Sequence, residues 1–206
     1  GDTLTTWWQL FRLSLWALCY KSHLPVSYSW AIKVTFESFV GWKRERVDNY
    51  MKRFYDSRIL CRMRKRAAQE VQKCKDEGIY TILLSATVSM IPELGAADLG
   101  FDHCIATRVK ELPDGTYSKL CDGKAVEGGQ KVIKIKEFCD SEFGKGSWEI
   151  VRAYGDHFTD VDILGLAEES FAVNPMSKLE TTANKKGWKV LDWEGGEIKG
   201  NGKKKV

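Results

Sequence analysis

Apolar residues in the first third of the chain recur at the spacing of an α-helix. Between residues 4 and 75 almost nothing alternates in the way that indicates strands, and apolar positions lie three or four residues apart. Two groups show this most clearly: Trp8, Phe11, Leu15 and Leu18, and then Val47, Tyr50, Met51 and Phe54. Pro25 and Gly41 interrupt the pattern, and the Asp-Glu-Gly at residues 76–78 is expected to end its last helix. The first third is therefore predicted to be mainly helical.

The pattern changes after Gly78 to short apolar runs that alternate with helical segments. Four of these runs are predicted to be strands: 79–84, 149–154, 170–173 and 188–193. Two further segments, 103–110 and 116–121, flank the turn signal Pro113-Asp114-Gly115 and are predicted to form a β-hairpin. Alternation of this kind is typical of an α/β fold whose sheet is covered by helices on both faces.

A length of 206 residues fits one domain with an insertion. We expect an α/β core made of residues 1–6 and 76–198, with residues 7–75 inserted as a separate helical segment. Residues 199–206 are rich in glycine and lysine and are predicted to be a disordered basic tail.

The composition, with 43% hydrophobic and 29% charged residues, is that of a soluble globular protein. A formal net charge of +4 is too small and too evenly spread for a nucleic-acid-binding protein, although it suits a small anionic substrate. Six cysteines without a C-x-x-C pair favour reduced thiols in a cytoplasmic protein over a zinc site or disulfide scaffold. Residues 7–20 are shorter than the ~20 that span a bilayer and contain polar residues, so neither membrane insertion nor a signal peptide is expected.

The densest basic run contains Arg58, Arg62, Arg64, Lys65 and Arg66. Such a run is typical of one solvated helix face. The alternative interpretation is an electropositive rim above an active site.

Ligands of open α/β sheets bind beyond the carboxyl ends of the strands, so polar residues that follow a predicted strand are candidates for a site. Ser85 directly follows the run 79–84, and its hydroxyl, with the backbone N–H groups of Ala86 and Thr87, can hold phosphate oxygens. The alternative is a serine that only caps the next helix.

Two carboxylates, Asp156 and Asp160, follow the run 149–154 in the pattern G-D-x-x-x-D. Carboxylates at the end of a buried strand need a cation or a donor as partner, and oxygen ligands of this kind suit Mg²⁺. The alternative is a turn aspartate followed by a helix cap. Lys131, after Gly128-Gly129 at the start of a predicted helix, can neutralise phosphoryl and carboxylate charge, although a lone lysine there is usually solvated.

Taken in this order, Ser85, Lys131 and the Asp156/Asp160 pair resemble the second, third and fourth motifs of the haloacid dehalogenase superfamily. The branch similar to phosphoserine phosphatase matches best, over about residues 76–193. The resemblance implies a Rossmann-like three-layer α/β/α core with a mainly parallel sheet and, in residues 7–75, an all-helical cap. It also implies an enzyme, a phosphatase, that hydrolyses a small-molecule phosphomonoester.

The family's first motif is D-x-D-G-T, and Thr3-Leu4-Thr5 is similar to its end. In that register the nucleophilic aspartate lies before residue 1, and Gly1 takes the place of the second aspartate. A shifted register makes Asp2 the catalytic acid but still leaves the nucleophile outside the sequence. We therefore expect upstream residues to carry the nucleophile.

The resemblance further implies an aspartyl-phosphate intermediate and Mg²⁺ bound by Asp156, with Asp160 as a further metal-site residue or as an anchor for water or Lys131. Ser85 and the Ala86 amide would bind phosphate oxygens, and Lys131 would stabilise the charge of the intermediate. Two alternatives stay open: an inactive phosphate-binding protein and a phosphotransferase. The aromatic-rich insert indicates a packed helical core, or else an apolar pocket for a large or lipid-like phosphomonoester. The oligomeric state is left open.

Overall fold

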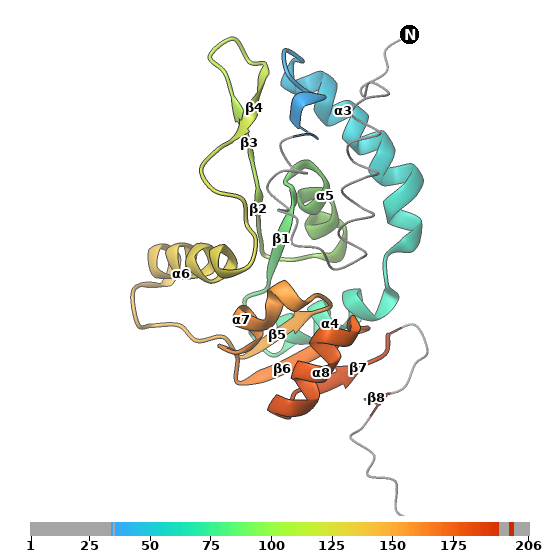
Figure 1. The fold of residues 1–206 in the computed structure, drawn as a ribbon, viewed down its shortest axis with the longest axis vertical. Helices are drawn as coiled ribbons and strands as arrows, with labels where there is room; N and C mark the ends of the chain where they lie inside the picture. The colour runs from blue at the N-terminus through green and yellow to red at the C-terminus, as the bar shows by residue number, and fades with distance from the viewer. Residues whose placement is uncertain (1–33, 35, 194–197, 200–206) are drawn as a thin grey trace, which may run out of the picture. The chain divides into compact units, whose positions relative to one another are not determined.

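The structure is a computed structural model that describes residues 34, 36–193 and 198–199 (Figure 1). Asp2, most of the first half of the predicted insert and nearly all of the predicted tail lie outside these residues. The chain divides into two compact units. The first unit contains residues 1–62, 85–98 and 104–126, and the second contains residues 63–84, 99–103 and 127–206.

In the first unit, helix α3 (Arg44–Phe54) continues into a π-helical turn, η1 (Tyr55–Ile59), and a 3-10 turn, η2 (Leu60–Arg62). Lys52 and Arg53 lie in the last turn of α3, where positive charge complements the helix dipole. The buried Tyr55 donates a 2.7 Å hydrogen bond to Asp98 at the end of helix α5 (Met90–Leu99), so the two helices are joined by a polar contact. The predicted helical pattern of Val47, Tyr50, Met51 and Phe54 is confirmed, although only Val47 is buried.

The core of the first unit is a cluster of side chains from α3, α5 and a β-hairpin. Its buried members are Phe36, Phe39, Val47, Met90, Val109 and Tyr117. The hairpin strands β3 (Val109–Glu111) and β4 (Tyr117–Cys121) are antiparallel. Asp114 closes the turn by accepting hydrogen bonds from the N–H (2.9 Å) and hydroxyl (2.7 Å) of Thr116. The predicted hairpin is therefore confirmed.

The predicted strand 103–110 is in fact two strands. Its first part, β2 (His103–Thr107), pairs with β1, and only the part after Arg108 pairs with β4. The chain changes partners at Arg108, whose side chain reaches Glu93 on α5 at 3.3 Å. Local sequence pattern does not encode such a change, because it depends on which strands lie alongside.

Strand β1 (Ile82–Val88) begins and ends later than predicted. Ile79 cannot begin the strand, because its N–H donates to Cys74 O (2.8 Å) and so ends helix α4 (Lys65–Asp76). The N–H of Thr81 donates to the carboxylate of Asp102 (2.8 Å) instead of to a strand. The predicted helix end is confirmed, with Gly78 in a left-handed conformation at φ 75°.

The second unit contains a sheet in the order β5-β6-β7-β8. Strands β5 (Arg152–Gly155), β6 (Glu169–Val173) and β7 (Lys189–Leu191) are parallel, and β8 (Ile198–Lys199) is antiparallel to β7. The helices of this unit besides α4 are α6 (Gly129–Phe143), the 3-10 turn η3 (Phe158–Asp160), α7 (Val161–Leu164) and α8 (Ser177–Lys186). Parallel strands that alternate with helices agree with the predicted α/β fold (Figure 1).

A second apolar cluster connects these strands and helices. Its buried members are Ala153, Leu164, Ala172, Leu179, Ala183 and Val190. Next to it, Tyr154 stacks on Phe171 with 4.7 Å between ring centroids and donates a 2.6 Å hydrogen bond to Glu70 of α4. Burial is the main reason why the pKa of Tyr154 is raised, and the bond to Glu70 adds to it. Helix α4 and strand β5 are therefore held together by a half-buried phenol.

The prediction of one solvated helix face for the basic run is wrong. Arg58 lies in η1 and Arg62 in η2, and the backbone is extended at Arg64, which is the N-cap of α4. The extended conformation at Arg64 separates the residues before it from Lys65 and Arg66, which begin α4.

None of the described helices has the length and apolar character that crossing a lipid bilayer requires.

Candidate functional site

Lys131 and Asp160 form a buried ion pair in the second unit. Lys131 is the third residue of α6, as predicted, and its Nζ lies 2.5 Å from Oδ1 of Asp160. Their side chains are only 12% and 9% exposed. A charged pair this far from water is stable only because each ion compensates the other. The structure thus brings together two of the residues that the sequence analysis selected.

The other carboxylate oxygen of Asp160 is also occupied. Its Oδ2 accepts a 3.3 Å hydrogen bond from the N–H of His157, and the His157 side chain accepts one from the N–H of Thr159, which together make a capping box for η3. The predicted alternative of a helix-capping aspartate is therefore correct for Asp160. The same side chain serves as a cap and as the partner of Lys131.

Gly155, the last residue of β5, leaves the room that Asp160 occupies. A Cβ atom at Gly155 would lie 2.8 Å from Cβ of Asp160 and 3.0 Å from its Oδ2, closer than Cβ atoms approach other atoms. The backbone of Gly155 thus passes directly beside the carboxylate. This contact explains the glycine of the G-D-x-x-x-D pattern.

Asp156 follows β5 directly, as the family resemblance implies, and its side chain is exposed. Its carbonyl oxygen accepts a 3.1 Å hydrogen bond from the N–H of Met176, which fixes the backbone between β5 and α8. The carboxylate is therefore held at a strand end and is open to a cation, whereas both oxygens of Asp160 are engaged.

Ser85 and Ala86 lie in the first unit and inside strand β1, not after a strand as predicted. Pairing with β2 carries the strand three residues past Ser85, to Val88. The Ser85 hydroxyl accepts a 3.1 Å hydrogen bond from the N–H of Thr87, so it is not an N-cap of helix α5. Its side chain is only partly buried, which leaves the hydroxyl proton available to a ligand.

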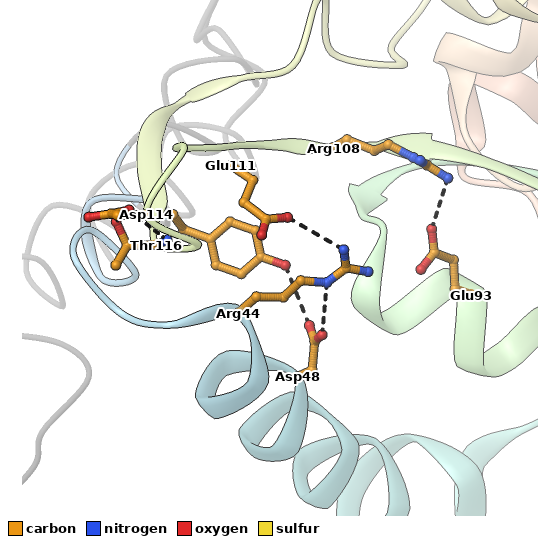
Figure 2. Close-up of polar contacts among 8 residues, drawn as sticks. Arg44, Asp48, Glu93, Arg108, Glu111, Asp114 and Thr116 are labelled. Carbon is orange, nitrogen blue, oxygen red and sulfur yellow. Dashed lines mark hydrogen bonds and ion pairs between the residues drawn. The ribbon is translucent and has the colours of Figure 1, made fainter.

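A polar cavity of about 520 Å³ lies in the same unit. It is lined by side chains from α3, the start of α5 and the β3–β4 hairpin, and Figure 2 shows their polar contacts. Arg44 lies 3.3 Å from Asp48 and 3.4 Å from Glu111, and Arg108 lies 3.3 Å from Glu93. The volume is in the range of small-molecule sites, and more than half of the lining residues are charged.

The donor set fits Mg²⁺ only in part. Mg²⁺ binds one or two carboxylates and keeps several waters. Asp156 meets this requirement, since its carboxylate is exposed at a strand end. In the described part of the chain, no three His, Cys, Asp or Glu side chains come together as a metal site. Further ligands would have to come from other residues, and the first-motif position Asp2 lies outside the described residues.

Two residues near the candidates were not selected from the sequence. Burial raises the pKa of Glu127, and the positive charge of Lys131 opposes this effect. Thr107 is fully buried and its hydroxyl donates a 2.8 Å hydrogen bond to the carbonyl of Ala86. A glutamate before a glycine pair and a threonine in a strand are both too common to be noticed in a sequence.

Comparison with known proteins places the chain in a family. The profile of the haloacid dehalogenase-like hydrolases matches residues 2–165, so the chain belongs to this family. The predicted resemblance is confirmed, and so is the expectation of an enzyme of the phosphatase type, since the relatives named below are phosphatases.

Histidinol-phosphatase of Neisseria meningitidis serogroup C is 26% identical over 170 residues, which cover 79% of this chain and 74% of the relative. Phosphoserine phosphatase SerB1 of Mycobacterium tuberculosis is 26% identical over 139 residues, 68% of this chain. The chain spans only 44% of the length of SerB1.

Solved structures show the same fold. A protein of unknown function from Bordetella pertussis Tohama I has a TM-score of 0.79 at 21% identity, covering 87% of this chain and 80% of that chain. A phospho-aspartyl intermediate analogue of phosphoserine phosphatase has a TM-score of 0.59 at 14% identity, covering 90% and 85%. These similarities confirm the predicted α/β fold with its parallel strands.

Proposed function

We propose that this protein is a Mg²⁺-dependent phosphomonoester hydrolase that acts through an aspartyl-phosphate intermediate. The observation that carries the proposal is the buried Lys131–Asp160 pair next to Gly155-Asp156. The similarity to histidinol-phosphatase and phosphoserine phosphatase supports the substrate class, because both names denote phosphatases of small molecules.

Each of these residues receives a distinct role. Lys131 neutralises negative charge that develops on the phosphoryl group, and Asp160 holds its ammonium in place. The Ser85 hydroxyl and the Ala86 N–H, both in strand β1, donate hydrogen bonds to phosphate oxygens. The attacking group is an aspartate of the family's first motif, outside the described residues. Attack by a carboxylate divides hydrolysis into formation and breakdown of an acyl phosphate, and each step has a lower barrier than direct attack by water.

Asp156 would hold Mg²⁺, together with groups of the first motif. When bound, Mg²⁺ screens the phosphoryl charge and orients the substrate. We assign Asp160 to Lys131 instead of to the metal, because both of its oxygens already accept hydrogen bonds.

The charged cavity of the first unit, some of whose polar contacts Figure 2 shows, favours a polar leaving group over a lipid-like one. Four acidic and three basic side chains line it: Asp48, Glu93, Glu111 and Asp122, and Arg44, Lys52 and Arg108. An acyl chain placed there would remove water from these ion pairs, whose side chains are partly exposed, and would offer them no hydrogen bond in its place. We therefore propose a compact, polar phosphomonoester as substrate, and residues 7–75, which include α3, as the cap that meets it.

The test is hydrolysis of p-nitrophenyl phosphate and a panel of phosphomonoesters by the full-length protein, with Mg²⁺ and with excess chelator. We expect turnover with Mg²⁺, loss of turnover with chelator and recovery when Mg²⁺ is restored. Asp156→Asn should lower kcat by at least about 100-fold, with an unchanged urea midpoint. Undiminished turnover in chelator would refute the metal dependence.

A further inference from the structure

The hydroxyl of Thr107 connects two backbone segments of the first unit. Thr107 ends strand β2 and is fully buried. Its hydroxyl donates to the carbonyl oxygen of Ala86 at 2.8 Å and accepts from the N–H of Val126 at 3.0 Å. Its own carbonyl accepts from the N–H of Ser89 at 2.9 Å. Thr107 is thus bonded to the segment that follows Ser85 at two points, the carbonyl of Ala86 and the N–H of Ser89.

The carbonyl of Ala86 belongs to the same peptide group as the N–H of Thr87. That N–H donates to the hydroxyl of Ser85 at 3.1 Å. One rigid peptide plane is therefore held at its oxygen by Thr107 and at its hydrogen by Ser85. The donors run in a single direction, from Val126 through Thr107 and the peptide to Ser85, and each bond in such a chain polarises the next.

We call this chain of hydrogen bonds, from Val126 to Ser85, the relay. Its direction determines where the hydroxyl proton of Ser85 can be donated. Because the Ser85 oxygen already accepts from Thr87, its own proton is left to be donated elsewhere. A hydroxyl oriented in this way is suited to a phosphate oxygen, which only accepts hydrogen bonds.

We propose that Thr107 is a positioning residue for phosphate binding, which acts through the Ala86–Thr87 peptide on the Ser85 hydroxyl. This inference rests on the proposed function of Ser85 and Ala86. A merely structural Thr107 would affect stability, since a buried hydroxyl satisfies two backbone groups, but would leave the kinetics of the folded enzyme unchanged.

The test compares Thr107→Val with Thr107→Ser in the full-length protein. Valine keeps the shape of threonine but removes the hydroxyl, and we expect kcat/KM for p-nitrophenyl phosphate to fall by about 10- to 100-fold. Inorganic phosphate should inhibit this variant more weakly. Serine keeps the hydroxyl and should restore kcat/KM to within about twofold of the wild type, a difference near the usual error of additivity.

Thr81→Val is the matched control. Thr81 is also a buried threonine, with its hydroxyl 2.7 Å from Asp102 Oδ2 and 3.1 Å from the Asp102 N–H, and it takes no part in the relay. It should lower the urea midpoint without changing kcat/KM. A Thr107→Val variant that loses stability but keeps wild-type kcat/KM would overturn the proposal.

A double variant tests the route through Ser85. In a Ser85→Ala background, adding Thr107→Val should lower kcat/KM by no more than about twofold, because the relay has lost its end. A full, independent loss in that background would show that Thr107 acts elsewhere. If Thr107→Val does not fold, Thr107→Cys replaces it, since a thiol occupies similar space and donates only weakly.

A readout without turnover separates this inference from the proposed function. If the wild-type protein hydrolyses no phosphomonoester, the proposed function fails, and amide hydrogen exchange at Thr87 tests the relay alone. Thr107→Val should speed exchange at Thr87 by at least about 10-fold while Thr81→Val leaves it unchanged, because of these two threonines Thr107 is the one bonded to that peptide group. Equal exchange at Thr87 in both variants would overturn the relay.

Discussion

Asp160→Asn should be among the most destabilising single changes at the candidate site. The substitution removes the carboxylate charge and leaves Lys131 as a cation that is only 12% exposed. At the 2.5 Å separation and an effective dielectric constant of about 20, Coulomb's law gives about 7 kcal/mol of attraction before desolvation. Measured losses of one partner from a buried pair are about 3–5 kcal/mol, which we expect for the free energy of unfolding.

The assay is urea unfolding followed by far-UV circular dichroism and tryptophan fluorescence. Glu137→Gln is the matched control, because Glu137 pairs with Lys134 on the same helix, α6, at 2.7 Å. In that pair the side chain of Lys134 is 36% exposed and that of Glu137 is 57% exposed. An exposed pair contributes about 0–1 kcal/mol. If Asp160→Asn shifts the midpoint no more than Glu137→Gln does, the buried pair does not stabilise the fold.

The double variant Lys131→Met/Asp160→Leu separates stability from chemistry. Replacing both charges with apolar side chains removes the desolvation penalty, so the double variant should be more stable than Asp160→Asn alone. It should nevertheless hydrolyse p-nitrophenyl phosphate at least about 100-fold more slowly than the wild type, since no charge remains to stabilise the transition state. A stable double variant with normal activity would refute the role proposed for Lys131.

Two further predictions concern a glycine and an acid-sensitive carboxylate. Gly155→Ala places a methyl group 2.8 Å from Asp160 Cβ and should cost about 1–3 kcal/mol in unfolding free energy by urea titration, whereas Gly129→Ala, with nothing closer than 4.0 Å, should not. Burial alone raises the pKa of Asp102, but hydrogen bonds from Thr81 and the charge of Lys75 lower it overall. This carboxylate therefore stabilises the fold above its unfolded pKa of about 3.9 and loses that contribution as the pH falls through its lower folded value. Acid titrations of wild type and Asp102→Asn should differ in that window, and identical titrations would refute the linkage.

Local sequence signals predicted those parts of the fold that depend on neighbouring residues. The hairpin turn at Asp114 is closed by Thr116 two residues away, and α4 ends at Gly78, which adopts a left-handed conformation. The limits of β1 were not predictable in this way. Ile79 is apolar and reads as part of a strand, but its N–H completes the end of α4. Chain neighbours determine the first kind of feature and tertiary partners the second.

The candidate site divides along the same line. Gly155, Asp156 and Asp160 lie within six positions of one another, so the sequence alone shows their pattern. The contact between Lys131 and Asp160 joins residues 29 positions apart, and the sequence left water as an alternative partner for that carboxylate. The role of Thr107 could not be predicted from the sequence, because threonine is common in strands. Its hydroxyl bonds to the carbonyl of Ala86, which lies 21 positions away in the sequence.

The basic run around Arg62 shows why charge in a sequence is hard to assign. Five basic residues within nine positions indicate a single face only if one helix carries them all. The extended backbone at Arg64 breaks that condition, so the five residues do not share one helix face.

Burial provides a criterion for the function of charge that sequence density does not. Arg152 also forms a close pair, 2.6 Å from Glu77 and 3.0 Å from Glu169, but those two carboxylates are 37% and 39% exposed and retain water. Such a network joins α4 to the sheet at a low desolvation cost. The Lys131–Asp160 pair has a much larger desolvation cost, because both side chains are almost completely removed from water. It therefore adds little stability compared with an apolar pair in the same place. Electrostatic stabilisation is strongest where water is excluded. A cation held in such a position is therefore suited to stabilise negative charge that develops during a reaction, which accounts for a desolvation cost that stability alone does not explain.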